Sequence, residues 1–331
     1  MGQEGNTLIP ILRHVVLPLA RNHESSLMSR TVTLADHADF RITYHQVGDT
    51  PTAGPLVITF GGQPSGLTDE GFGTAFCAKS GWDSIYVAQR AWSQYQGLSI
   101  KQFMDAVLPF IEGRDVVTYG ASLGAYAAFY FGGAIGARII GAAPMQSLWP
   151  EVMVKRWEGV PLIHNRLEDT PKSPTPPAVI YDPKMSRDSL VVEKILKPIY
   201  PEIRILEVPY SGHTVLVSLG EYGLLKQVIR SLVEDNVLLS PELPTETSAI
   251  WLRQRAKEIK RKNPAKAKAM LVRSLDMRPS KDTASVLLSL LIKLGDMKEA
   301  KVLIDAQSKG KKGQAGFVPS VLRLAQENNL V

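Results

Sequence analysis

The sequence contains very little cysteine: Cys77 is the only one among 331 residues. An internal disulfide is therefore impossible, and metal sites built from several thiolates at short spacing are excluded as well. This cysteine usage is typical of proteins in a reducing compartment, so we expect a cytoplasmic protein.

Long apolar runs are also lacking. The apolar stretch at residues 8–20 contains Arg13, His14 and two prolines, and it is far shorter than the roughly 20 apolar residues that a membrane-spanning helix needs. It has neither a basic leader nor a clean small-residue cleavage site, which argues against a secretory signal peptide. We expect residues 1–29 to form a packed or docking segment of a protein without a transmembrane segment.

The composition shows no sign of disorder, because 44% of the residues are hydrophobic and 21% are charged. A length of 331 residues predicts one catalytic domain and a smaller second unit. The net charge of +6 is unevenly spread, since residues 241–331 hold 18 Lys and Arg against 9 Asp and Glu. The basic character therefore belongs to the C-terminal part.

Short β-rich runs alternate with helix-length segments between residues 30 and 240, a pattern that predicts a mostly parallel sheet covered by helices. Helical crossovers are predicted near 99–111, 122–133, 186–197 and 215–234. The first two strands are joined by a short connection and should be antiparallel. The eight predicted strands lie at residues 30–34, 40–45, 56–60, 84–87, 116–119, 137–142, 178–182 and 203–208.

The turn Gly120-Ala121-Ser122-Leu123-Gly124 is the strongest chemical signal. This G-x-S-x-G motif follows a β-branched and aromatic run and precedes the helix-forming run 123–131. A serine hydroxyl becomes a good nucleophile only when a base takes its proton, so its oxygen must project from a tight turn. The two glycines leave room for that turn, and we predict that Ser122 is a nucleophile.

The predicted base is His213, because it is the only one of six histidines that comes shortly after the last strand. The acid is left open between Asp182, which ends the seventh predicted strand, and Asp188, which lies six residues further on. Either carboxylate could hold the imidazole in the right tautomer and stabilise the imidazolium.

A glycine-rich stretch, residues 60–66, follows the third predicted strand and exposes backbone N–H groups. It is not a phosphate loop, since neither G-x-G-x-x-G nor a following Gly-Lys-Ser/Thr is present.

Together, these four elements in this order resemble the α/β-hydrolase superfamily over about 210 residues. The resemblance implies an α/β fold with a mostly parallel eight-stranded sheet and helices on both faces, over residues 30–240. It also implies that 144–177, a segment containing Trp149, Trp157 and His164 before a proline-rich stretch, is a lid-like insertion whose aromatic residues line a substrate mouth. An irregular surface loop is the alternative.

The resemblance also assigns roles within the site. It places the acid a few residues beyond its strand, which favours Asp188 and leaves Asp182 to cap the turn that begins at Pro183. It implies an oxyanion hole formed by the backbone N–H groups of Gly62 and Leu123, with Gln63 as the nearest substitute for Gly62.

The strand signals stop after the proline-rich and polar residues 240–247, and the remaining segment is helical. Ala267, Leu271, Ser274 and Pro279 fall close to the positions typical of tetratricopeptide repeats, and Ala300 lies 33 residues after Ala267. We therefore predict a small all-α, tetratricopeptide-like domain at residues 241–331.

The basic part of this segment invites a nucleic-acid hypothesis, because eight Lys and Arg crowd residues 253–268. Only Trp251 is nearby to stack on bases, so a solvated helix is the better interpretation. A protein partner of this helical segment, or an anionic glycan, would fit the same charges.

We expect a serine hydrolase that cleaves a carboxylic ester through an acyl-enzyme, without cofactor or metal. The stretch from Gly71 through Trp92 and Tyr95 to Gln146 resembles hydrolase-fold proteins associated with bacterial surface polysaccharides, which favours an O-acyl or O-acetyl ester of a saccharide. Thioesters and lipid esters use the same constellation. The alternative is a non-catalytic scaffold that recruits partners through its basic helical tail.

Overall fold

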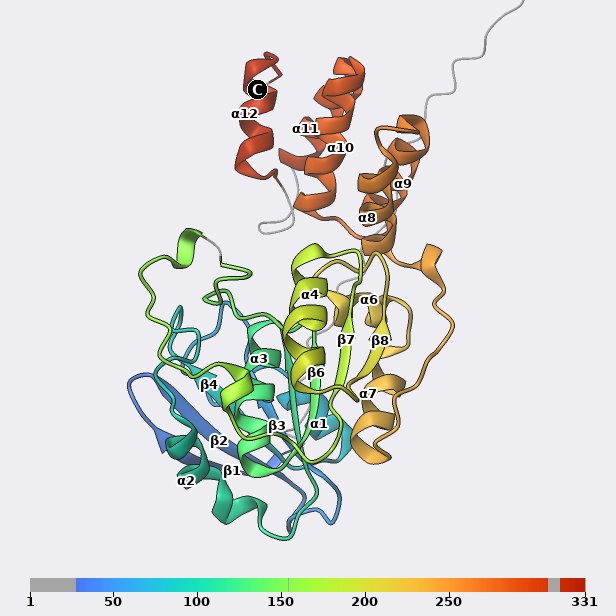
Figure 1. The fold of residues 1–331 in the computed structure, drawn as a ribbon. Helices are drawn as coiled ribbons and strands as arrows, with labels where there is room; N and C mark the ends of the chain where they lie inside the picture. The colour runs from blue at the N-terminus through green and yellow to red at the C-terminus, as the bar shows by residue number, and fades with distance from the viewer. Residues whose placement is uncertain (1–27, 154, 309–315, 331) are drawn as a thin grey trace, which may run out of the picture.

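The computed structural model describes residues 28–153, 155–308 and 316–330; the apolar stretch 8–20 lies outside them. As predicted, eight strands form one sheet, and their order in it is β1-β2-β4-β3-β5-β6-β7-β8 (Figure 1). They are β1 (Met28–Asp36), β2 (Phe40–Val47), β3 (Leu56–Phe60), β4 (Ser84–Gln89), β5 (Val116–Ala121), β6 (Arg138–Ala142), β7 (Ala178–Tyr181) and β8 (Arg204–Glu207).

The pairing of β1 with β2 is antiparallel, as expected, and the five pairings from β4 to β8 are parallel. The pairing of β2 with β4 is also antiparallel, which the sequence pattern did not indicate. Strand β3 is buried at all five positions. A central strand covered on both faces reads as a continuous apolar run, which is why its sequence, LVITF, does not alternate.

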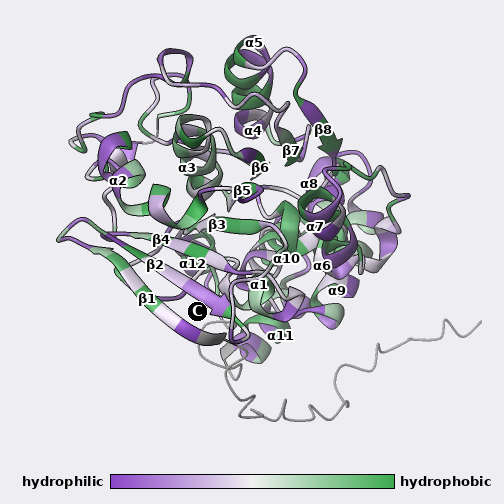
Figure 2. Ribbon diagram, turned by 90° about the horizontal axis from the view of Figure 1, so that it is seen from below, coloured by the Kyte–Doolittle hydropathy of each residue, from purple (hydrophilic) through white to green (hydrophobic). Residues whose placement is uncertain are grey.

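Helices cover both faces of the sheet (Figure 2). One buried apolar cluster joins the strands to α2, α3 and α4, and a second joins them to α1, α6 and α7. Helix α4 continues through a π-helical turn (Val192–Leu196) into the short α5 (Lys197–Ile199). The covering helices are α1 (Thr74–Ser80), α2 (Ile100–Ile111), α3 (Leu123–Gly132), α4 (Ser186–Val191), α6 (Val215–Glu221) and α7 (Leu225–Glu234).

Two helical features differ from the sequence prediction. The single helix expected at 215–234 is broken into α6 and α7, because Gly223 adopts a left-handed conformation with φ 75°. Helix α1 was not predicted; it is only seven residues long and buries Cys77 completely. Burial raises the pKa of the Cys77 thiol to about 12.

The described residues of 249–330, which we call the helical unit, form five helices on top of the α/β unit, residues 28–240 (Figure 1). Their own buried cluster includes Leu252, Leu271 and Leu288. The tetratricopeptide-like repeat stays a prediction. No helix in the described part of the chain is long and apolar enough to cross a membrane. The helices are α8 (Ala249–Ile259), α9 (Pro264–Met277), α10 (Lys281–Leu294), α11 (Met297–Ser308) and α12 (Pro319–Glu327).

Three helices of this unit begin at a residue whose side chain caps the helix N-terminus. The side chains of Ser248, Asn263 and Ser280 each accept a hydrogen bond from a backbone N–H in the first turn of α8, α9 and α10. Gly295 ends α10 in the left-handed conformation. These local signals explain why the segment is helical, and its buried cluster explains why the helices pack together.

Candidate active site

The predicted site residues all follow parallel strands at the carboxyl edge of the sheet, where α/β proteins place their ligands. Gly62 follows β3, Ser122 follows β5, Asp182 and Asp188 follow β7, and His213 follows β8. The parallel pairing of these strands therefore directs four separate segments of the sequence toward one edge.

Ser122 lies on a sharp turn between β5 and α3, with φ 56° and ψ −122°. A non-glycine residue with positive φ is strained, so the surrounding packing must hold it there. A Cβ atom on Gly120 would lie 2.1 Å from the carbonyl oxygen of Gly124, and one on Gly124 would lie 2.2 Å from that of Phe60. The turn can be this tight only because both positions are glycine.

The His213 ring lies between Ser122 and Asp188. Its Nε2 atom is 2.7 Å from the Ser122 Oγ, and its Nδ1 atom is 2.9 and 3.0 Å from the two carboxylate oxygens of Asp188. A carboxylate facing Nδ1 selects the tautomer in which Nδ1–H donates to Asp188 and Nε2 accepts from the serine hydroxyl. Such a ring can take up the serine proton.

Burial differs sharply within this group. Asp188 is 1% exposed, whereas the His213 side chain is 35% exposed. The carboxylate is thus shielded from water, while the imidazole is partly open to solvent. This is the arrangement that a general base and its orienting acid require.

Asp182 occupies a different position, although it is equally buried. Its Oδ1 accepts the backbone N–H of Lys184 at 2.8 Å, and its Oδ2 accepts that of Gly212 at 2.7 Å. Burial raises the pKa of Asp182, and the backbone N–H donors oppose that rise. Of the two aspartates that the sequence left open, Asp188 is therefore the one at His213, and Asp182 organises two turns.

The loop after β3 runs beside the Ser122 turn, since a Cβ atom on Gly62 would lie 3.5 Å from the carbonyl oxygen of Ala121. The Tyr95 hydroxyl donates to the carbonyl of Gly61 at 2.9 Å and ties this loop to the segment after β4. Leu123 is the first residue of α3, and the first N–H groups of a helix have no partner within it. The assignment of these amides to an oxyanion hole stays a prediction.

The segment after β4 is a feature whose geometry the sequence did not reveal. Trp92, Gln94 and Tyr95 all have positive φ, of 69°, 55° and 61°. The buried Gln89 holds the turn together, because its Oε1 accepts the Ser93 hydroxyl at 3.1 Å and the Tyr95 N–H at 2.7 Å. No glycine or asparagine marks these positions, so the turn left no signal in the sequence beyond its aromatic residues.

The described residues of the insertion 144–177 form no strand, and much of the aromatic surface of the insertion packs inward. Trp149 is buried edge-on against Tyr126. Trp157 is buried too, but its ring lies 5.3 Å from that of Trp92, which is 55% exposed. Of these tryptophans, Trp92 from the β4 loop is therefore the one that faces solvent, and the lid-like role of the insertion stays a prediction.

His164 anchors this insertion. Its ring stacks on Tyr130 at 4.1 Å, contacts the Tyr126 hydroxyl at 2.7 Å and donates from Nε2 to the carbonyl of Leu98 at 2.9 Å. Burial lowers the pKa of His164 to about 4. The residue is thus a neutral packing element rather than a candidate base.

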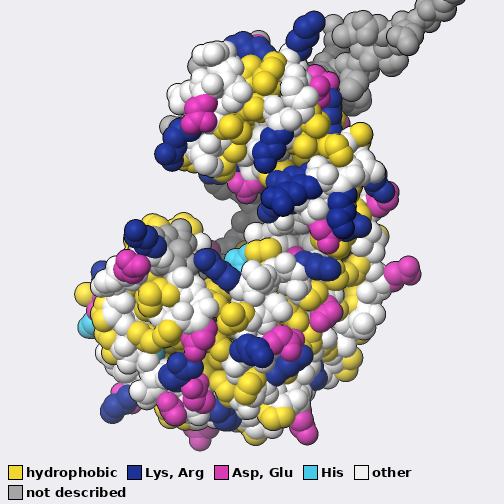
Figure 3. All heavy atoms as spheres, turned by 45° about the horizontal axis from the view of Figure 1, so that its top comes forward, with side chains coloured by type: hydrophobic (Ala, Val, Ile, Leu, Met, Phe, Trp, Pro, Cys, Tyr) yellow, Lys and Arg dark blue, Asp and Glu magenta, His cyan; other side chains and the backbone are white. Residues whose placement is uncertain are grey.

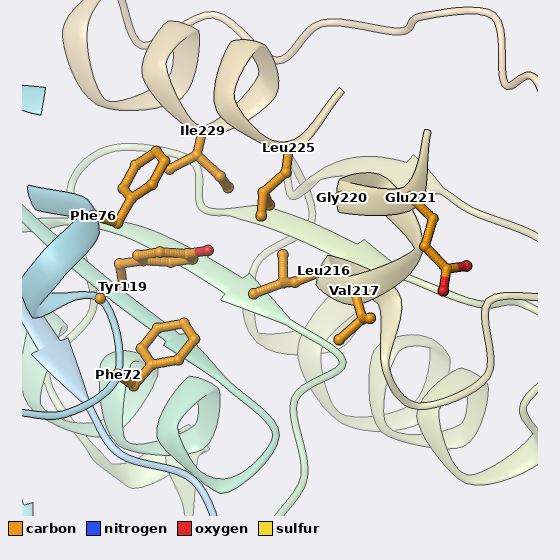
Figure 4. A pocket seen from close by; sticks show the side chains of 10 residues that line it. Phe72, Phe76, Tyr119, Leu216, Val217, Gly220, Glu221, Leu225 and Ile229 are labelled. Atoms are coloured by element: carbon orange, nitrogen blue, oxygen red, sulfur yellow. The ribbon is translucent and has the colours of Figure 1, made fainter. Parts of the chain in front are cut away.

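An open apolar pocket of about 500 Å³ lies between α1, α6, α7 and β5 (Figure 4). Leu216 and Val217, which follow His213 in the chain, form one wall, and Phe72, Phe76 and Tyr119 form the other. None of the predicted site residues lines it. Within the described residues, no cluster of three His, Cys, Asp or Glu side chains could hold a metal ion.

A hollow lies between part of the helical unit and the α/β unit, and Lys and Arg side chains gather on the helical unit where it borders this hollow (Figure 3). Several cations of this unit are paired internally: Arg255 with Glu258, and Lys268 with Asp296 and Glu299. Part of the basic cluster at 253–268 is therefore accounted for by contacts within the unit.

Similarity to known proteins was found among solved structures. No family model matches the sequence, and no curated protein matches it either. Among solved structures, the capsule O-acetyltransferase of Neisseria meningitidis serogroup A is similar over 60% of this chain and 92% of its own, with 14% identity and a TM-score of 0.44. Est1E from Butyrivibrio proteoclasticus is similar over 62% of this chain and 99% of its own, with 9% identity and a TM-score of 0.42.

The acylaminoacyl peptidase of Pyrococcus horikoshii is similar over 64% of this chain but only 42% of its own, with 13% identity and a TM-score of 0.46. The class that the structure itself defines is an α/β protein with a mostly parallel eight-stranded sheet.

Proposed function

We propose that this chain is a serine hydrolase of the α/β-hydrolase type that cleaves carboxylic esters. The single observation that carries the proposal is the position of the His213 ring, 2.7 Å from the Ser122 hydroxyl and 2.9 Å from the Asp188 carboxylate. A serine in an ordinary surface turn does not require a histidine and a buried aspartate aligned behind it in this order.

In the proposed reaction, the Ser122 oxygen attacks the ester carbonyl carbon while His213 Nε2 takes the hydroxyl proton. The carbonyl oxygen becomes an oxyanion, which the N–H groups of Leu123 and Gly62 stabilise by about 3 kcal/mol each. The C–O bond to the alcohol then breaks, and His213 returns the proton to the departing alkoxide. Water repeats the sequence on the acyl-enzyme and releases the carboxylic acid. The scheme requires no metal or cofactor.

We further propose that the ester is an O-acyl group on a saccharide. Trp92 presents a large exposed ring in the loop after β4, at the carboxyl edge of the sheet, and β4 pairs in parallel with β3, the strand that precedes the Gly62 loop. The buried Trp157 ring and the tightly bonded turn around Gln89 fix its orientation. A rigid, solvent-facing indole is well suited to stack on the apolar face of a sugar ring, whereas a lipid ester would call for an enclosed apolar channel.

A fluorophosphonate probe tests the proposal, because it forms a covalent bond only with an activated serine. We expect mass spectrometry to locate one adduct on Ser122, and we expect His213→Ala to abolish it while Ser122→Ala serves as the blank. A folded wild-type protein that acquires no adduct would contradict the enzyme and favour the alternative, a scaffold that recruits a protein through its helical unit.

A further inference from the structure

His213 lies on a loop that needs external support. In this base loop, residues 208–214, Tyr210 and Gly212 both have positive φ, of 63° and 61°. Glycine adopts this conformation freely, but tyrosine does not, so contacts of its side chain must offset the strain. From the α/β unit, the Asp182 carboxylate holds the N–H of Gly212.

The side chain of Tyr210 finds its hydrogen-bond partners on helix α8 of the helical unit. Its hydroxyl donates to the Glu258 carboxylate at 2.8 Å and accepts from Arg255 Nη1 at 3.0 Å. The indole of Trp251 meets the tyrosine ring at nearly a right angle, with centroids 6.0 Å apart. Trp251, Arg255 and Glu258, on successive turns of α8, thus all contact the Tyr210 side chain of the base loop.

Helix α8 also contacts the residue directly before the histidine. A Cβ atom on Gly212 would lie 2.4 Å from Nε2 of Gln254, so the amide rests against the glycine backbone. Gln254 lies on the same face of α8 as Trp251 and Glu258, three and four residues away. The base loop is therefore enclosed between Asp182 on one side and α8 on the other.

The chain on the other side of His213 is attached to the same helix. Helix α6 begins two residues after His213 and ends at Glu221. The Glu221 carboxylate accepts the Ser248 hydroxyl at 2.5 Å and the Ile250 N–H at 3.2 Å, both at the start of α8, and it pairs with Arg278 at 3.0 Å. Both flanks of His213 are thus anchored in the helical unit.

We infer that α8 positions the base loop, so that the helical unit is a working part of the active site rather than an independent appendage. This inference rests on the proposed function, because it concerns the same reaction. Proton transfer requires the His213 ring to stay within hydrogen-bond distance of Ser122, and a displacement of about 1 Å can lower the rate by about 100-fold. Tyr210, Gln254 and Trp251 are the positioning residues.

The test compares full-length variants on p-nitrophenyl acetate. We expect Trp251→Ala to lower kcat by about 10- to 100-fold while KM changes less than about twofold, because the base moves but the substrate pocket does not. Tyr210→Phe keeps the ring and loses only the hydroxyl contacts, so its effect should be smaller and of the same kind. Lys257→Ala, on the exposed side of the same helix, is the matched control and should leave kcat unchanged.

Hydrogen exchange of the amides in residues 208–214 gives a readout that does not depend on turnover. We expect exchange of this loop to rise in Trp251→Ala and to stay at the wild-type level in Lys257→Ala, well below the melting temperature of each. Normal kcat in Trp251→Ala, or unchanged exchange of the loop, would overturn the inference. A wild-type protein without a fluorophosphonate adduct would refute the proposed function instead, and loop exchange would still decide whether α8 holds the loop.

Discussion

Asp182 accepts a hydrogen bond from the backbone N–H of Gly212 at 2.7 Å, so the second aspartate of the site holds the residue directly before His213. Asp188 contacts the imidazole itself, at 2.9 Å. Two buried carboxylates from the segment after β7, Asp182 in the turn and Asp188 in α4, therefore act on the same histidine in different ways, one through its ring and one through the backbone of the residue before it. The two should be separable by substitution.

We predict that Asp188→Asn lowers kcat on p-nitrophenyl acetate by about 10⁴-fold, because an amide favours the wrong imidazole tautomer. Asp182→Asn should retain activity within about tenfold. It should lower the free energy of unfolding by about 1–2 kcal/mol, since an amide offers one acceptor oxygen where the carboxylate offers two. Steady-state kinetics and urea unfolding check both, and a full-rate Asp188→Asn would contradict the assignment of the acid.

From the lowered pKa of His164 we predict how the free energy of unfolding changes as the pH falls. In the unfolded chain a histidine titrates near pH 6.5, whereas burial lowers the pKa of His164 to about 4 in the folded protein. Between these values the unfolded state binds a proton that the folded state does not. The contribution of neutral His164 to the free energy of unfolding is thus complete above pH 6.5. About 3 kcal/mol of it is lost as the pH falls toward 4.

Urea unfolding at several pH values between 7 and 4.5 measures this loss. His164→Gln should be less stable at pH 7 but should show a flatter pH dependence than the wild type. Some slope should remain, because burial also lowers the pKa of His45. The control, Leu162→Gln, replaces an exposed side chain of the same insertion that does not titrate, and it should keep the wild-type slope. An identical slope in His164→Gln would refute the neutral, buried state of this residue.

Because the Ser122 turn is tightly packed, we predict that one added methyl group strongly lowers the stability of the protein. Gly124→Ala places a Cβ atom 2.2 Å from the carbonyl oxygen of Phe60, so β3 and α3 must separate. We expect a loss of about 3 kcal/mol in the free energy of unfolding, together with loss of fluorophosphonate labelling. Gly54→Ala is the control, because nothing lies within 4 Å of a Cβ atom there. Equal melting temperatures for the two variants would contradict the packing described for the turn.

Trp92 allows a test of the substrate class. Trp92→Ala should raise KM for an O-acetylated oligosaccharide by about tenfold, equivalent to about 1.4 kcal/mol of binding, while Trp92→Phe has a smaller effect. Hydrolysis of p-nitrophenyl acetate should change little in either variant, because that ester carries no sugar ring for the indole to bind. An unchanged KM for the saccharide in Trp92→Ala would exclude stacking on this ring.

The sequence predicted the sheet and the meeting of Ser122 with His213 because both depend on local patterns. Period-two and continuous apolar runs mark strands, and the order of the motifs along the chain then brings their ends to one edge. The choice between Asp182 and Asp188 was open because both follow β7 within a few residues. Only the three-dimensional path of the turn shows which carboxylate faces the ring.

Other features of the structure have no local signal in the sequence. The strained turn at Trp92, Gln94 and Tyr95 contains no residue that favours positive φ, and its conformation depends on the distant contact from Tyr95 to Gly61. The contact of Tyr210 with Glu258 joins residues 48 positions apart. Such pairings are set by how the two units pack, which hydrophobic periodicity does not report.

Cys77 has a practical consequence. The thiol lies on the buried face of α1 and burial raises its pKa to about 12, so it will be almost entirely protonated and shielded from reagents at neutral pH. A cysteine introduced at an exposed position, such as Met153 in the insertion or Lys257 on α8, would therefore be the most reactive thiol in the described chain. The protein is thus suited to site-specific spin or fluorophore labelling, and a pair of labels across the hollow would report its width in solution without removal of the native cysteine.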